Sequence, residues 1–198
     1  MGMMHEEMEI LFSKHPPYDE LELLATVQAL IVYAIAIYYS VSDTSHHPGI
    51  DDTTFKNIHG LLYRLASSGI LVTEAETRMT RPTWEEWIIL SAKRRTVLTM
   101  YAFESVYTTI AGLPTFPAYE LRLMPVPGAK SLWQAPSRAQ WEEAYDSSLK
   151  EWGGPCFVMR ELNVKPEPGT ERAARLQRWL EDADEFSMML LMMVTACE

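Results

Sequence analysis

The sequence predicts an all-α fold, an irregular multi-helix bundle with proline-rich loops wrapped over it. Apolar residues recur with helical spacing, and no stretch alternates convincingly as a strand would. Acceptor side chains followed three residues later by Glu or Gln mark helix starts, and Gly or Pro marks helix ends. With 198 residues, 47% of them hydrophobic, the chain can bury one sizeable core. We therefore predict one α-helical domain over residues 1–198.

The first long helix is predicted from Asp19 to about Val41, because Asp19 and Glu22 have the spacing of a capping pair. Within it, residues 23–42 carry no charge over a length that could cross a bilayer. Several polar residues interrupt this stretch, and acidic rather than basic residues flank it, which disfavours a membrane span. We expect a helix buried on nearly every side of a soluble bundle, and no membrane partner.

The second helix is predicted from near Asp52 to Gly69, with an apolar stripe along one face. The stripe consists of Phe55, Ile58, Leu62 and Leu65. The one dense group of potential metal ligands flanks its start, at His46, His47, Asp51 and Asp52. Their spacing matches no known metal pattern, and Asp52 is expected to cap the helix. Glycine motifs for nucleotides are also absent, so we predict no metal and no other cofactor.

The longest helix is predicted to open at a capping box, Thr83 with Glu86, and to end at Gly112. One side of its helical wheel carries Trp87, Arg94, Leu98, Tyr101 and Ser105. This helix should therefore be central. Residues 113–136 contain five prolines and no helical period, which predicts an extended segment wrapped over the bundle.

The C-terminal third is predicted to hold two more helices. Ser137 with Gln140 should cap a short helix that runs to about Trp152. After a second irregular stretch, residues 170–198 are predicted as one last helix whose Met-rich and Leu-rich second half docks into the bundle. The chain has twelve Met and six Trp, which suits a pocket for an irregular apolar molecule, although ordinary core packing explains them more simply.

Charge and cysteine content exclude several classes of function. The formal charge is −10, and Lys93–Arg95 is the only basic cluster, so direct nucleic-acid binding is not expected. Two widely separated cysteines and no N-terminal leader indicate the cytoplasm or nucleus. Cys156 has no nearby His in sequence, and no G-x-S-x-G elbow occurs, which disfavours nucleophilic catalysis.

Four stretches carry a resemblance to a known family: LATVQALIVYA at 24–34, HGLLYRLASSGI at 59–70, WxxWI…RRT at 84–96, and LWQAPSRAQW at 132–141. Over about residues 20–145, the chain resembles the middle regulatory region of fungal zinc-cluster transcription factors. The resemblance implies an all-α domain that senses small molecules or holds a regulator inactive. The six cysteines of that family's zinc cluster have no counterpart, since only Cys156 and Cys197 are present.

The chain departs from the family pattern beside its paired arginines. A glutamate is common there in the family, but Ser91 and Ala92 occupy the zone. Arg94 or Arg95 is then available for another partner. Arg94 could hold a ligand carbonyl or carboxylate, or it could pair with a buried acid or with backbone carbonyls; the second alternative is favoured, because an unpaired buried charge is costly.

Two classes of function fit these observations. The first is a cofactor-independent enzyme, pericyclase-like, that cyclises or isomerises a hydrophobic polyene or terpenoid-like intermediate in fungal secondary metabolism. Its polarising catalytic donors would be Arg94, Tyr101 and His59. Its substrate-binding walls would be Trp84, Trp87, Trp133 and Tyr107.

The second class is a ligand-sensing or protein-interaction module that pairs with a full-length regulator or with a second copy of itself. The chain could also be a fragment of a longer regulator. We give the enzyme a slight preference, because a sensor without an effector domain needs a partner to read it, whereas an enzyme does not.

Overall fold

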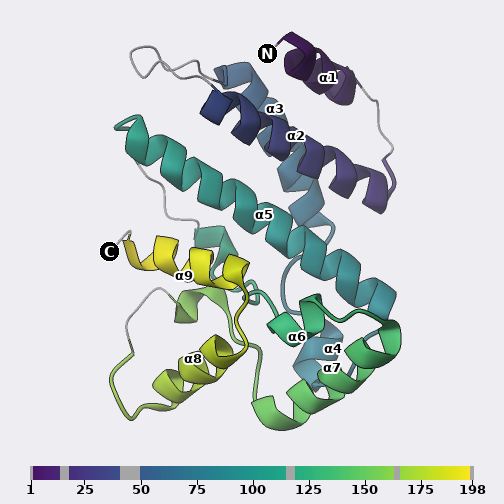
Figure 1. Cartoon of the computed structure of the whole chain (residues 1–198), viewed down its shortest axis with the longest axis vertical. Helices are drawn as coiled ribbons and strands as arrows, with labels where there is room; N and C mark the ends of the chain where they lie inside the picture. The colour runs from purple at the N-terminus through teal and green to yellow at the C-terminus, as the bar shows by residue number, and fades with distance from the viewer. Residues whose placement is uncertain (1, 14–17, 41–49, 115–118, 163–165, 197–198) are drawn as a thin grey trace. The chain divides into compact units, whose positions relative to one another are not determined.

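The computed structural model describes residues 2–13, 18–40, 50–114, 119–162 and 166–196. These residues form nine α-helices and two short 3₁₀ helices, and none of them forms a strand (Figure 1). The predicted all-α fold is confirmed. The chain divides into two compact units: unit 1 is Met1–Gly69 with Arg95–Thr115, and unit 2 is Ile70–Arg94 with Phe116–Glu198. The single domain stays a prediction.

Unit 1 contains α1 (Gly2–Ser13), α2 (Glu20–Ser40), α3 (Asp52–Ser67) and the second part of α5 (Trp84–Ile110). In Figure 1, α2 lies against both α1 and α3, which are its packing partners. The buried positions of α2 are Leu23, Leu24, Thr26, Val27, Leu30, Ile31, Ala34 and Ile37.

By length and composition, α2 could cross a membrane, since its most apolar window has a mean hydropathy of 1.9; 44% of that window is buried inside the protein. A core helix passes the same test. The absence of a membrane partner therefore stays a prediction.

The helix starts in unit 1 follow local capping, with one correction. Asp19 Oδ1 accepts a hydrogen bond from the Glu22 backbone N–H at 2.7 Å, as the capping pair predicts. The cap of α3 is Asp51 rather than Asp52: Asp51 is extended, and its carboxylate accepts from Thr53 and Thr54 N–H at 2.9 Å. Asp52 is the first helical residue, where its negative charge suits the helix dipole. His46 and His47 lie outside the described residues.

Unit 1 also holds an aromatic core that joins three helices. It consists of Tyr38 from α2, Phe55 from α3, and Phe103 and Tyr107 from α5. Five ring pairs among them have centroids 5.1–6.4 Å apart. Four of these pairs are tilted or edge-on and Phe55–Phe103 is stacked; aromatic pairs of this kind add to the apolar burial that stabilises a core.

Unit 2 contains the remaining elements: α4 (Glu74–Arg78), the first part of α5, η1 (Tyr119–Leu121), α6 (Lys130–Trp133), α7 (Arg138–Trp152), η2 (Met159–Glu161), α8 (Glu171–Glu181) and α9 (Glu185–Ala196). The predicted capping box is present, since Thr83 and Glu86 bond each other reciprocally. Ser137 caps α7 through the Gln140 N–H. All six tryptophans of the sequence fall in unit 2.

Two predictions for unit 2 were wrong in part. The stretch 113–136 is not wholly extended, because η1 and α6 form within it. The last helix is interrupted at 182–184, so that α8 and α9 are separate. The Asp184 carboxylate accepts bonds from the backbone N–H and hydroxyl of Ser187 at 2.8 and 2.7 Å. An Asp in this role starts a new helix, since its side chain competes for backbone donors.

Candidate functional site

A largely buried ion pair between Arg94 and Glu76 joins α5 to α4. Two parallel contacts join them, Nη1 to Oε1 at 2.6 Å and Nη2 to Oε2 at 2.8 Å. Arg94 Nε also donates to the Ile70 carbonyl at 2.9 Å, and Nη2 donates to the Leu71 carbonyl at 2.7 Å. We call this arrangement the arginine clamp, and only 7% of Arg94 is exposed.

Thr73 completes the clamp with two further hydrogen bonds to the Glu76 carboxylate. Its backbone N–H and hydroxyl donate to Glu76 Oε2 at 2.8 and 3.0 Å. Burial raises the pKa of Glu76, but the hydrogen bonds and charge of Arg94, with the bonds from Thr73, outweigh it and hold this pKa below its ordinary value. Glu76 is therefore a carboxylate at neutral pH.

The clamp gives Arg94 an acidic partner from outside its own helix. The acid comes from Glu76, 18 residues upstream on another helix. Four donor contacts of Arg94 are already made within the protein. The geometry agrees with the alternative in which Arg94 pairs with a buried acid and backbone carbonyls. Its role as a polarising donor stays a prediction, and it would require this pairing to open.

Three of the predicted substrate-binding tryptophans do come together. Trp87 packs against Trp133 and Trp141, with centroids 6.3 and 5.5 Å apart, and Trp141 packs against Tyr145 at 5.1 Å. Trp84 lies against the same group. In this tryptophan cluster, Trp87 and Trp141 are packed core, at 9% and 1% exposed, while Trp84 and Trp133 are half-buried beside them. The substrate-binding role of Trp84, Trp87 and Trp133 stays a prediction.

Inside the cluster, one polar atom has no partner. The indole Nε1 of Trp141 is buried and makes no hydrogen bond. By contrast, Trp179 Nε1 donates to the Pro127 carbonyl at 3.0 Å. Burial of a donor without an acceptor is destabilising, so the two indoles form a natural pair for comparison.

Two further titratable groups of unit 2 lie within electrostatic reach of the clamp. Burial, with the Glu76 carboxylate adding to it, raises the pKa of Tyr145 to about 12. The same causes, in the same order, raise the pKa of the Cys156 thiol to about 11. A thiol that stays protonated at neutral pH is a poor nucleophile, which fits the expectation that Cys156 is not catalytic.

The other predicted donors belong to unit 1. His59 Nε2 pairs with the Glu104 carboxylate near the surface. This hydrogen bond raises the pKa of His59 against the opposing effect of burial. His59 and Tyr107 both contact the ring of Phe55, and Tyr101 is half-buried on α5. Arg94 lies in unit 2, so the three proposed donors are divided between the units.

The described residues contain no group of three or more His, Cys, Asp or Glu side chains that could hold a metal ion.

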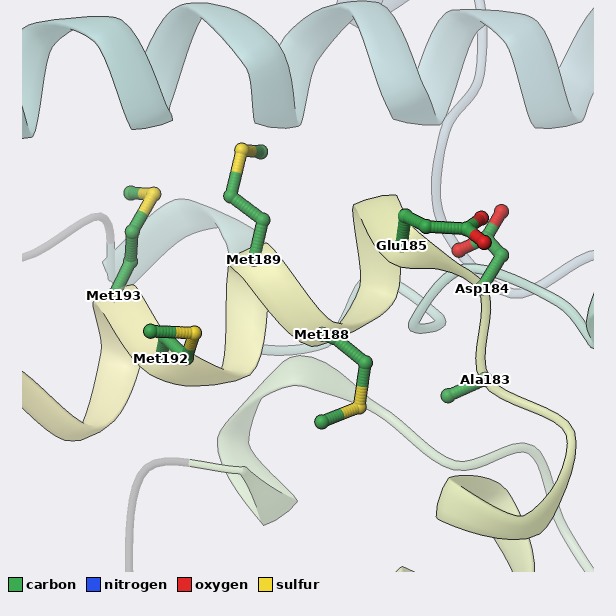
Figure 2. A pocket seen from close by; sticks show the side chains of 7 residues that line it. All are labelled: Ala183, Asp184, Glu185, Met188, Met189, Met192 and Met193. Carbon is green, nitrogen blue, oxygen red and sulfur yellow. The ribbon is translucent and has the colours of Figure 1, made fainter.

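The sequence did not reveal an open groove along α9, which we call the methionine groove. Its volume is about 620 Å³, and it is lined by Ala183, Asp184, Glu185, Met188, Met189, Met192 and Met193. Figure 2 shows Met189 and Met193 extending to the same side of α9 and Met188 to the opposite side. Exposure is 41% for Met188, 40% for Met189 and 69% for Met192.

The prediction that the second half of the last helix docks is true for part of its surface. Leu190 and Val194 are buried, while the methionine pairs on either side of Leu190–Leu191 line the groove. The M-M-L-L-M-M pattern was the available signal, but an apolar period does not reveal whether a neighbour covers each side.

Comparison with models of protein families, with curated proteins and with solved structures finds no match for this chain. The resemblance to the fungal regulatory region therefore remains a prediction from the quoted stretches.

Proposed function

We propose that this protein is a ligand-binding module that holds a neutral, extended apolar molecule, such as a polyene or terpenoid-like compound, in the methionine groove. The proposal takes the ligand-sensing alternative over the cyclase. The observation that carries it is the concentration of exposed methionines around an open hollow on α9.

Size and side-chain chemistry both support this proposal. A volume of about 620 Å³ lies in the range of sites for small molecules, roughly 300–1,000 Å³. Methionine is unbranched and polarizable, and it adapts to irregular apolar surfaces, which is why it is common at sites with variable ligands. Contiguous exposed apolar surface is a liability in solution unless something binds it.

The charge at one end of the groove indicates which ligands it suits. Asp184 and Glu185 line that end. The pKa of Glu185 is lowered by its own backbone N–H and by Lys130, whose Nζ lies 3.1 Å from Oε1. The carboxylates of Asp184 and Glu185 outnumber the one ammonium of Lys130, and the remaining negative charge repels an anionic head group. We therefore expect a neutral ligand to bind better than a fatty-acid anion of similar length.

A neutral polyene that fluoresces in apolar surroundings, diphenylhexatriene, tests the proposal by titration. Met192→Glu places a charge in the groove. The bound probe would strip water from this carboxylate, so probe binding should weaken about tenfold or more. Met3→Glu is the matched control, since Met3 is 75% exposed on α1, outside the groove, and it should bind as the wild type does. The free energy of unfolding of Met192→Glu should stay within about 0.5 kcal/mol of the wild type.

Equal probe affinity in the wild type and in Met192→Glu, or no binding by the wild type, would contradict this function. A polyene anion such as parinaric acid serves as the second ligand, and tighter binding of the anion would contradict the inferred preference for neutral molecules.

The cyclase or isomerase stays a separate prediction, with its own test. The purified protein would be incubated with late polyene or terpenoid intermediates, and the products searched for an isomer of unchanged mass. Turnover that is lost in Tyr101→Phe or in a folded Arg94 variant would favour catalysis. Co-purification with a larger zinc-cluster protein would favour pairing with a full-length regulator.

A further inference from the structure

The walls of the methionine groove are chemically unlike other apolar walls, because their thioether sulfurs can be oxidised. Four of the seven lining residues are methionines, and Met188, Met189 and Met192 are among the exposed large apolar residues. Four other methionines are buried and protected from solvent: Met8, Met100, Met124 and Met159. Oxidation of methionine follows the accessibility of its sulfur.

We propose that the methionine groove is an oxidation-controlled binding site, in which a peroxide converts Met188, Met189 and Met192 to sulfoxides and thereby releases the apolar ligand. This inference rests on the proposed function, and it adds a modification site and a means of regulation to it.

The reaction balances without any group from the protein. A sulfur lone pair attacks one oxygen of hydrogen peroxide, the S–O bond forms and the O–O bond breaks. The other oxygen leaves as hydroxide and takes up the proton of the transferred oxygen, which gives water. The sulfur is oxidised by two electrons and the peroxide is reduced by two. Methionine sulfoxide reductases reverse the change, one enzyme for each sulfoxide epimer.

The surroundings of the groove make the product unfavourable for an apolar ligand. A sulfoxide oxygen is a strong hydrogen-bond acceptor, and covering it with an apolar molecule removes its water. The polar side chains among the lining residues are Asp184 and Glu185, and ionised carboxylates accept hydrogen bonds but do not donate them. Neither carboxylate can donate a hydrogen bond to a sulfoxide oxygen that has lost its water. Each oxidised wall therefore opposes the ligand.

The fold should survive oxidation of the groove methionines, so that the loss of binding is distinct from unfolding of the protein. Met192 is 69% exposed, so its sulfoxide remains hydrated in the folded protein. Oxidation of Met100 or Met124, both fully buried, would instead place a polar oxygen in a core and destabilise the fold. Limited peroxide should therefore alter binding before it alters stability.

The experiment uses the full chain and diphenylhexatriene as the ligand. The protein is treated with limiting hydrogen peroxide, the oxidised residues are located by mass spectrometry of its peptides, and probe affinity is measured before and after. We expect the three exposed groove methionines to be modified ahead of the four buried ones. Probe affinity should fall about tenfold or more, and reductases A and B together should restore it.

A matched variant isolates the groove sulfurs. Met188→Leu/Met189→Leu/Met192→Leu removes the three exposed sulfurs of the walls and leaves that of Met193. Its probe affinity before peroxide serves as its own reference, and the fold-loss on treatment should be much smaller than in the wild type. Met3→Leu removes an exposed sulfur outside the groove and should lose affinity as the wild type does. Met192→Leu alone, at the most exposed of the three positions, serves if the triple variant does not fold, and it should retain part of the affinity.

Sulfoxides at all three positions with unchanged probe affinity would overturn the inference. An equal loss in the triple leucine variant would overturn it as well, because the cause would then lie elsewhere. If the untreated wild type fails to bind the probe, both the proposed function and this inference fall. If the wild type binds the probe and peroxide does not change its affinity, this inference falls and the proposed function stands.

Discussion

The tryptophan cluster with its arginine clamp and the methionine groove both belong to unit 2 and are both rich in large side chains, yet they differ in almost every physical respect. In the cluster, flat aromatic rings pack against one another and leave little surface exposed. In the groove, three of the four methionines are 40–69% exposed. Rings that fill a core give stability, whereas adaptable exposed side chains can accept a guest. Aromatic content alone therefore does not distinguish a packed core from an open groove.

The largest expected effect tests whether the clamp is structural. Arg94→Ala should lower the free energy of unfolding by about 3–5 kcal/mol, because it leaves the largely buried Glu76 carboxylate without its cationic partner. It also leaves the Ile70 and Leu71 carbonyls without a donor that they have in the wild type. Urea denaturation followed by circular dichroism measures the change.

Arg78→Ala is the control, because Arg78 and Glu74 form an exposed pair of the kind worth about 0.5 kcal/mol. Similar losses of unfolding free energy in the two variants would mean that burial does not make the clamp more stabilising than a surface ion pair. The contrast between a structural clamp and an open groove would then be wrong.

An intermediate effect is expected from acid. The pKa of Glu76 in the folded protein lies below its ordinary value of 4.5. The ordinary pKa applies to the unfolded chain. The stabilisation that ionised Glu76 gives to the folded protein is therefore fully present above this value, and it is lost as the pH falls through the lower pKa of the folded state. Unfolding free energies measured between pH 7 and pH 3 should fall less steeply in Glu76→Gln than in the wild type. Parallel curves would show that this carboxylate does not carry the acid dependence.

The smallest effect compares the two buried indoles. Phenylalanine at position 179 removes the donor of the bond to the Pro127 carbonyl, whereas phenylalanine at position 141 removes a donor that has no acceptor. Trp179→Phe should therefore lower the free energy of unfolding by about 1 kcal/mol more than Trp141→Phe, since both lose similar apolar volume. Thermal and urea unfolding of the two variants give the difference; a larger loss for Trp141→Phe would indicate an acceptor near its indole.

Local signals predicted a good part of this structure. The starts of α5 and α7 were predictable because a cap involves residues three apart, as Thr83 with Glu86 and Ser137 with Gln140 show. The same reasoning was one residue off at α3, since Asp51 and Asp52 are adjacent acceptors of equal propensity.

Features that depend on distant residues could not be predicted in this way. The partner of Arg94 lies on a short helix that the sequence did not reveal, and no spacing rule links Glu76 to it. The break before α9 depends on Asp184 capping a helix inside a continuous helical pattern. The groove was missed because a run of methionines predicts an apolar surface without indicating whether it is covered.

The placement of the indole side chains gives the molecule an internal reporter. Because all six tryptophans belong to unit 2, selectively excited tryptophan fluorescence reports on that unit alone, while the far-ultraviolet circular dichroism comes from the helices of both. In one thermal melt, tryptophan emission follows the unfolding of unit 2 and ellipticity follows the unfolding of both units. Coincident transitions in the two signals are the mark of a single cooperative fold.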